Sequence, residues 1–178
     1  MTIWLEEYMQ ATPIEGKPIV DIYHTPPFRD AATYVKVIER PEGTLSCCWN
    51  KGLDERADMF DLLKLAKGHF GNEKANLGEA VQFAKDSGWL ASRLPVTTVD
   101  LDGATAERLR RLMTMDYPLN YRNPAILDGG SWHVLFHDTR DMEYRFYCPD
   151  PPVGLEGLAE LVRVVAQACD LMRDFGLH

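Results

Sequence analysis

Residues 127–177 read LDGGSWHVLFHDTRDMEYRFYCPDPPVGLEGLAELVRVVAQACDLMRDFGL and decide the fold of the chain. A glycine turn precedes two runs of alternating apolar residues, 131–137 and 142–148, and this alternation is typical of strands. A proline-rich break at 149–152 then ends the second strand. Apolar residues recur at helical spacing over about 155–175. The segment therefore predicts a β-hairpin followed by a long amphipathic helix.

The alternation also predicts which side chains of the hairpin share a face. Placing Phe136 opposite Tyr144, with a three-residue loop at 139–141, puts the aromatic residues of both strands on one side. A helix of this length, about 30 Å, is long enough to cross a sheet. We expect it to pack on the aromatic face with this apolar stripe: Leu158, Leu161, Val162, Val165, Cys169, Met172 and Phe175.

The rest of the chain alternates short β-rich runs with helical ones. Strands are predicted at residues 2–9, 18–23, 33–39, 44–49 and 95–101, and helices at 54–69, 77–86 and 104–115. The third and fourth of these strands form a hairpin around a turn at Pro41-Glu42-Gly43. The first two helices form a helical hairpin in the middle of the chain. The fold class is thus α+β, a mainly antiparallel sheet with a long C-terminal helix on one face, in a single domain over residues 1–178.

Composition excludes several classes of function. The chain of 178 residues carries a formal net charge of −8 and has no basic stripe, which disfavours nucleic-acid binding. The first nine residues lack a basic segment, so they do not resemble a signal peptide, and no long apolar run predicts a membrane span. We therefore expect a cytoplasmic protein whose four cysteines stay reduced. The oligomeric state is left open.

Histidines and cysteines offer the first candidate chemistry. His133 and His137 lie on a predicted strand about 13 Å apart, too far to bind one metal ion. With Glu143 beside His137 they form a polar face, which is either exposed to solvent or a surface for a partner. Cys47 and Cys48 are adjacent, and this spacing matches neither a zinc motif nor a thioredoxin motif. We expect at least one of them to be buried in a core. The alternative is that one of them is a nucleophile paired with a histidine.

We expect two further cysteines and two aspartates to have structural roles. Cys148 and Cys169 are expected to face each other as buried thiols between hairpin and helix. Asp100 and Asp102 suggest a metal loop, but the other ligands of a calcium loop are missing, so we interpret Asp102 as a helix cap or turn residue.

Two other groups are candidates for binding. Tyr117, Tyr121 and Arg122 lie in a polar loop and are candidates for lining a ligand cleft. The predicted helix at 54–69 begins with four acids, which suit the positive end of a helix dipole and also a basic partner. They are Asp54, Glu55, Asp58 and Asp61.

The run Leu127 to Val134, then Tyr144 to Pro149, then a leucine-rich helix, resembles the C-terminal part of some uncharacterised bacterial α+β proteins. Some of these are suspected of being immunity proteins in toxin systems. The resemblance covers about 50 residues and its motif is structural. It implies an immunity-like role and carries no catalytic residue to this chain.

These observations favour a protein without enzymatic activity that binds another protein. No phosphate-binding glycine loop or assembled catalytic set is visible, and we expect no cofactor and no bound metal. The partner would be a basic protein such as a toxin. The Asp and Glu side chains of this chain would attract it, and binding would block its active site sterically. One alternative is a small hydrolase or transferase that uses a cysteine or a carboxylate with a histidine. Another is a sensor of a small ligand.

Overall fold

The structure is a computed structural model that describes residues 14–26, 32–52, 94–118, 130–137, 142–147 and 153–177, together with a few positions between 64 and 89. Six strands and two helices are described in full. In chain order they are β1 (Lys17–Thr25), β2 (Thr33–Glu39), β3 (Leu45–Lys51), β4 (Thr97–Asp100), α5 (Gly103–Met113), β5 (Ser131–Phe136), β6 (Glu143–Tyr147) and α6 (Glu156–Ala168).

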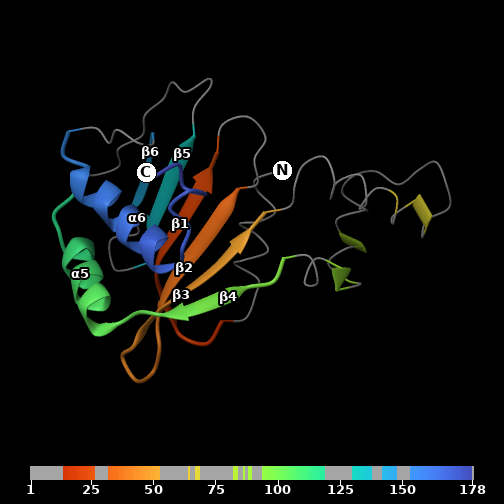
Figure 1. Cartoon of the computed structure of the whole chain (residues 1–178), viewed down its shortest axis with the longest axis horizontal. Helices are drawn as coiled ribbons and strands as arrows, with labels where there is room; N and C mark the ends of the chain where they lie inside the picture. The colour runs from red at the N-terminus through yellow and green to blue at the C-terminus, as the bar shows by residue number, and fades with distance from the viewer. Residues whose placement is uncertain are drawn as a thin grey trace.

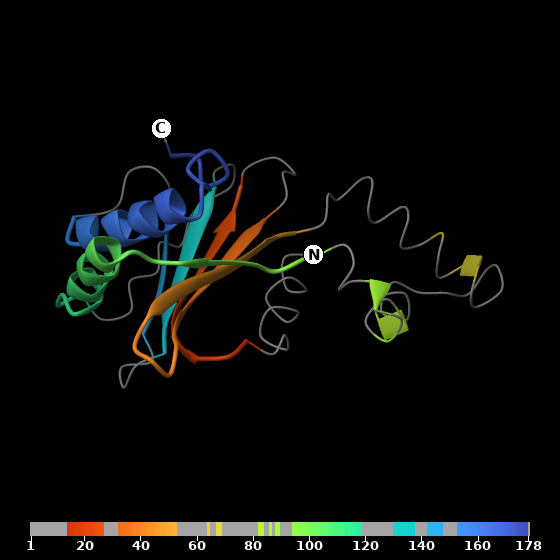
Figure 2. The same ribbon diagram turned by 60° about the horizontal axis from the view of Figure 1, so that its bottom comes forward.

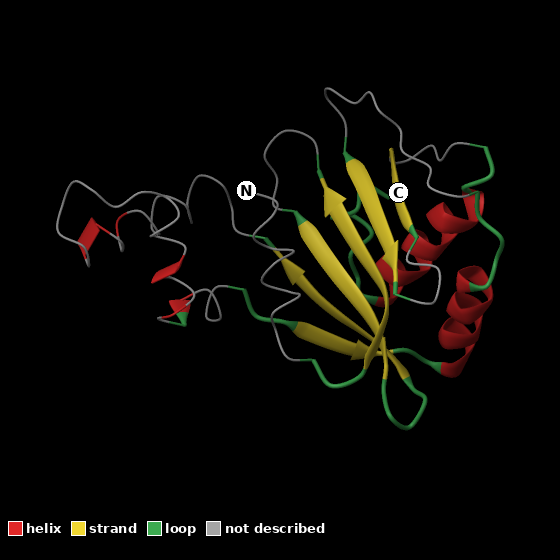
Figure 3. Ribbon diagram, turned by 180° about the vertical axis from the view of Figure 1, so that it is seen from behind, coloured by secondary structure: helices red, strands yellow, loops and turns green. Residues whose placement is uncertain are grey.

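The six strands form one antiparallel sheet in the order β4-β3-β2-β1-β5-β6 (Figure 1). The predicted hairpin of β2 and β3 is confirmed, and Gly43 takes the left-handed conformation that its turn requires. The hairpin of β5 and β6 is also confirmed. Because β1 pairs with both β2 and β5, it joins the two hairpins at the centre of the sheet (Figure 3).

Both helices lie on the same side of the sheet (Figure 2). Asp102 begins α5 by accepting hydrogen bonds from the backbone N–H groups of Ala104 and Thr105, as expected of a helix cap. The apolar side chains of the sheet and the two helices form one core. We call this side of the sheet the helix-covered face. Its largest fully buried side chains include Trp132, Phe136 and Tyr144.

The C-terminal helix is shorter than predicted. It ends at Ala168 instead of near residue 175, because Asp170 takes a left-handed conformation with φ 56°. The N–H of Asp170 then bonds the carbonyl of Gln167, and the N–H of Leu171 bonds the carbonyl of Ala166. These two bonds form a Schellman motif, which usually has glycine at the left-handed position. The apolar spacing continues past this break, so periodicity alone could not locate it.

The register of the C-terminal hairpin differs from the prediction by two residues. Val134, not Phe136, lies opposite Tyr144, and the backbone N–H of Phe136 bonds the carbonyl of Met142. Side chains alternate with a period of two, so a shift of two residues leaves every side chain on its predicted face. The alternation therefore predicts the face on which each side chain lies, but it does not distinguish registers that differ by two residues.

Several predicted elements lie outside the described residues. They include the strand at 2–9 and most of the helical hairpin at 54–69 and 77–86. No helix in the part of the chain that the structure describes is long and apolar enough to cross a bilayer.

Candidate functional site

The face of the sheet opposite the helices carries polar side chains together with apolar ones such as Ile38. Strand alternation places Asp21 of β1, Tyr34 and Lys36 of β2, and Cys48 of β3 on this side. His133 of β5 lies on it too, next to Tyr23 of β1 in the strand register. Several of these side chains are buried although neither α5 nor α6 covers them: Asp21, Tyr23, Tyr34, Cys48 and Asn50. We call this side the polar face.

Asp21 is the centre of one group on the polar face. Asp21 is 4% exposed, and its Oδ2 accepts a hydrogen bond from the hydroxyl of Tyr34. The Nε2 of His137 lies 2.8 Å from the same oxygen. His137 follows β5 directly, and its backbone N–H bonds the carbonyl of Ile19, which brings the ring to β1. The carboxylate thus holds one edge of the histidine ring.

A second histidine–carboxylate pair lies on the neighbouring strands. The Nε2 of His133 lies 3.1 Å from Oε1 of Glu143, and the same oxygen accepts a hydrogen bond of 2.9 Å from Nε of Arg145. Arg145 is the most exposed member, with 60% of its side chain accessible. The expectation that Glu143 lies beside His137 is wrong. The two-residue register shift brings Glu143 to His133 and leaves His137 to Asp21.

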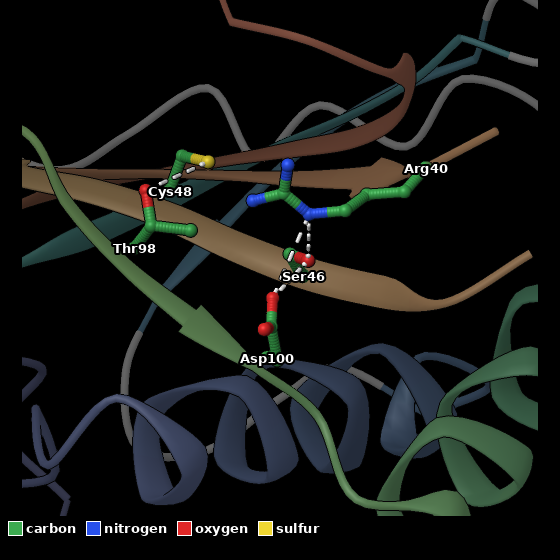
Figure 4. Close-up of polar contacts among 5 residues, drawn as sticks. All are labelled: Arg40, Ser46, Cys48, Thr98 and Asp100. Carbon is green, nitrogen blue, oxygen red and sulfur yellow. Dashed lines mark hydrogen bonds and ion pairs between the residues drawn. The ribbon is translucent and has the colours of Figure 1, made fainter. Parts of the chain in front are cut away.

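The other end of the polar face carries a smaller set of contacts (Figure 4). Ser46 of β3 donates a hydrogen bond of 2.7 Å to Asp100 of β4 and accepts one of 2.9 Å from Arg40. The thiol of Cys48 lies 3.6 Å from the hydroxyl of Thr98. Asp100 is thus a partner of Arg40 and Ser46 instead of a metal ligand. Among the described residues no group of three or more His, Cys, Asp or Glu side chains could hold a metal ion.

Asp102 has its own small set of hydrogen bonds at the start of α5. The hydroxyl and the backbone N–H of Thr105 both donate to its carboxylate. These bonds hold the pKa of Asp102 below its ordinary value. The cap therefore stays ionised at neutral pH, as its place at a helix N-terminus favours.

The cysteines that the structure describes do not pair with histidine. Cys47 points into the helix-covered face, where a hydrogen bond with Cys169 and burial raise the pKa of its thiol well above the ordinary value. A protonated, buried thiol is a poor nucleophile. Cys148 lies outside the described residues, so its expected pairing with Cys169 stays a prediction. The described partner of Cys169 is Cys47.

The remaining predicted site residues divide into two groups. Tyr117 is buried, and its hydroxyl donates a hydrogen bond of 2.6 Å to the backbone carbonyl of Leu112, so it belongs to the core and not to the mouth of a cleft. The others lie outside the described residues: Asp54, Glu55, Asp58, Asp61, Tyr121 and Arg122.

Sequence reasoning missed Asp21 and Tyr34. Residues 18–23 form a short run that is apolar apart from Asp21, and its overall apolarity predicts a strand without marking the aspartate as a site residue. The usable signal was the aspartate itself. A charged residue between Val20 and Ile22 on a strand must face the side opposite theirs, and a buried charge needs partners.

Comparison with protein-family models, with curated proteins and with solved structures finds no match to this chain. The geometry of its own residues is therefore the basis for a functional proposal.

Proposed function

We propose that this chain is a non-enzymatic protein-binding protein that engages its partner through the polar face at β5 and β6. The contact surface is a patch of four residues, His133, His137, Glu143 and Arg145, which we call the β5–β6 patch. The observation that carries the proposal is the pairing of both histidines with carboxylates from the two strands that flank β5. Such pairs hold charged and polar groups in fixed positions on a rigid sheet, which suits recognition.

The partners of the described nucleophiles support binding over catalysis. Covalent catalysis needs a hydroxyl or thiol within hydrogen-bond reach of a general base. The Tyr34 hydroxyl donates to Asp21, but Tyr34 is only 1% exposed and so is out of reach of a substrate, and the Cys48 thiol contacts Thr98.

We infer that the partner is basic and that the setting is cytoplasmic, as for an immunity or inhibitor protein that blocks a toxin. The net charge of −8 favours encounter with a basic surface. Glu143 offers a carboxylate at the patch itself, and the acids at positions 54–61 would add to the attraction. Cys47, Cys48 and Cys169 are free thiols, which agrees with a reducing compartment.

Site-specific photocrosslinking tests the proposal. A photoreactive amino acid at position 145, in the patch, is expected to capture one defined protein in cells, in an adduct that forms less readily at high salt. The matched control places the same group at Glu107, an exposed position on α5. Adding Glu143→Gln to the position-145 variant should weaken the adduct while the protein stays folded. Equal capture from both positions, or no capture from the patch, would contradict the proposal.

A hydrolase with a carboxylate–histidine site is the second candidate, and Asp21 favours it. A buried carboxylate that holds a histidine ring is the orienting part of a general-base arrangement. The test is hydrolysis of a panel of ester and phosphoester substrates by the wild type and by His137→Ala. Turnover that His137→Ala abolishes would support this candidate over binding, whereas equal background rates would remove it.

A further inference from the structure

A row of side chains crosses the helix-covered face at the end where β1 finishes and β2 begins. His24 of β1 lies opposite Thr33 of β2 on one side and opposite Trp132 of β5 on the other. Thr33 in turn lies opposite Lys51 of β3. Directly opposed residues of antiparallel strands have their Cβ atoms about 5 Å apart, so these side chains are immediate neighbours.

The segment that follows α6 covers this row. The ring of Phe175 stacks on the ring of His24, with centroids 5.3 Å apart and planes at 21°. The backbone carbonyl of Asp174 accepts a hydrogen bond from His24, and its carboxylate lies 2.7 Å from the ammonium of Lys51. Three contacts therefore hold this segment over the end of the sheet.

Two polar side chains beneath the segment lack hydrogen-bond partners. His24 is 2% exposed and Thr33 is 1% exposed. Among the described residues, neither Nδ1 of His24 nor Oγ1 of Thr33 has a hydrogen-bond partner. A buried polar atom without a partner is costly and rare in native proteins, so two of them on opposed residues point to a group that bonds both.

The protonation state of His24 defines the chemistry of that group. Burial lowers the pKa of His24 to about 4, and the contacts with Asp174 offset only part of this effect. The ring is therefore neutral at pH 7 and carries one N–H, which is directed to Asp174. Nδ1 is then an acceptor and needs a donor, whereas the Thr33 hydroxyl can donate or accept. The same burial disfavours a charged ligand.

We propose that a neutral hydroxyl-bearing molecule bridges Nδ1 of His24 and Oγ1 of Thr33 beneath the segment that follows α6. Its O–H donates to the histidine, and its oxygen accepts from the threonine. An internal water molecule and a small alcohol-type ligand share this chemistry. The site is on the opposite side of the sheet from the β5–β6 patch, so the proposal stands apart from the proposed function.

Solution NMR and native mass spectrometry on the full chain test the bridge directly. For water, we expect cross-relaxation peaks at the water frequency to the Thr33 methyl group and the His24 ring. For an organic ligand, we expect peaks from its own protons and an added mass that is lost on denaturation. Absence of both signals would overturn the proposal.

Thr33→Val supplies a second test, because valine keeps the shape of threonine and removes the hydroxyl. If the hydroxyl bonds a bridging molecule, the substitution should lower the folding equilibrium constant roughly tenfold and abolish the cross-relaxation peaks. The matched control is Thr97→Val, at an exposed position of β4, which should change the constant less than about threefold. An unchanged or increased constant for Thr33→Val would show that the hydroxyl has no bonded partner and would overturn the proposal.

Discussion

The two faces of the sheet bury side chains by different means. On the helix-covered face, α5 and α6 pack on aromatic and branched residues such as Trp132 and Val134. On the polar face, Asp21 and Tyr34 are just as inaccessible, yet they are held by a hydrogen bond between them. Burial and apolarity are therefore separate properties in this protein. The first face stabilises the fold, whereas the second is better suited to holding functional groups in fixed positions.

The largest expected effect is a cavity on the helix-covered face. Phe136→Ala removes a fully buried ring and should lower the free energy of unfolding by about 3–5 kcal/mol. Leu135→Ala, one residue earlier and on the other face, removes a side chain that is only partly buried and should cost no more than about 1.5 kcal/mol. Urea denaturation of the two variants measures the difference. Equal losses would mean that the two faces are packed alike.

The pH dependence of stability should come next in size. His24 has a pKa lowered from 6.5 to about 4, so the folded protein binds this proton less tightly than the unfolded chain. Stability is then complete above pH 6.5 and falls as the pH drops from 6.5 toward 4, by about 3 kcal/mol over the whole window.

A substitution isolates this contribution from that of the carboxylates. Between neutral pH and about pH 5.5, where most carboxylates are still ionised, His24 should account for a loss of about 1 kcal/mol. His24→Gln does not titrate, and its urea midpoint should change much less over that interval. An equal decline in both proteins would assign the effect to other groups.

Two buried tyrosines, one on each side of the sheet, allow the hydrogen-bond contributions of the two faces to be compared directly. Tyr34 donates to a carboxylate on the polar face, and Tyr117 donates to a backbone carbonyl beside the helix-covered face. Hydrogen bonds to charged groups contribute more, so Tyr34→Phe should cost about 2 kcal/mol and Tyr117→Phe about 1 kcal/mol. Thermal unfolding measured side by side gives the order, and the reverse order would contradict a larger contribution from the Tyr34 bond.

The smallest expected effect concerns the break after α6. Asp170 holds a left-handed conformation that glycine adopts more easily. Asp170→Gly should raise the stability by about 0.5–1 kcal/mol without moving the segment that covers the helix-covered face. Calorimetry checks the gain. A loss would indicate that the aspartate side chain makes a contact that glycine cannot replace.

Sequence patterns predicted most of the described fold for one physical reason. Alternation and helical spacing report which side of an element is apolar, and so they located β1 to β6, α5 and the start of α6. They carry no information that separates registers differing by two residues, which is why Phe136 was placed opposite Tyr144. Nor do they report a helix break at an aspartate, because Leu171, Met172 and Phe175 continue the apolar spacing on the far side.

The candidate site was less predictable than the fold. His133, His137 and Glu143 were identified because histidines on a strand are conspicuous, and their shared face followed from alternation. The partners of the two histidines were not identified, because the contact between His137 and Asp21 depends on β1 lying next to β5. Strand order is a property of the whole chain and is not encoded in any local pattern. The pairing of Cys47 with Cys169 was missed for the same reason.

The turn that follows α6 forms a small cooperative unit of its own. The helix satisfies its last carbonyls at Asp170 and Leu171, and residues 171–177 then close a separate turn in which the N–H of Leu177 bonds the carbonyl of Met172. No hydrogen-bond ladder runs continuously from one to the other, so the turn is fastened by the contacts of Asp174 and Phe175. In deuterium exchange, its amides should open locally while those of α6 stay protected until the whole molecule unfolds.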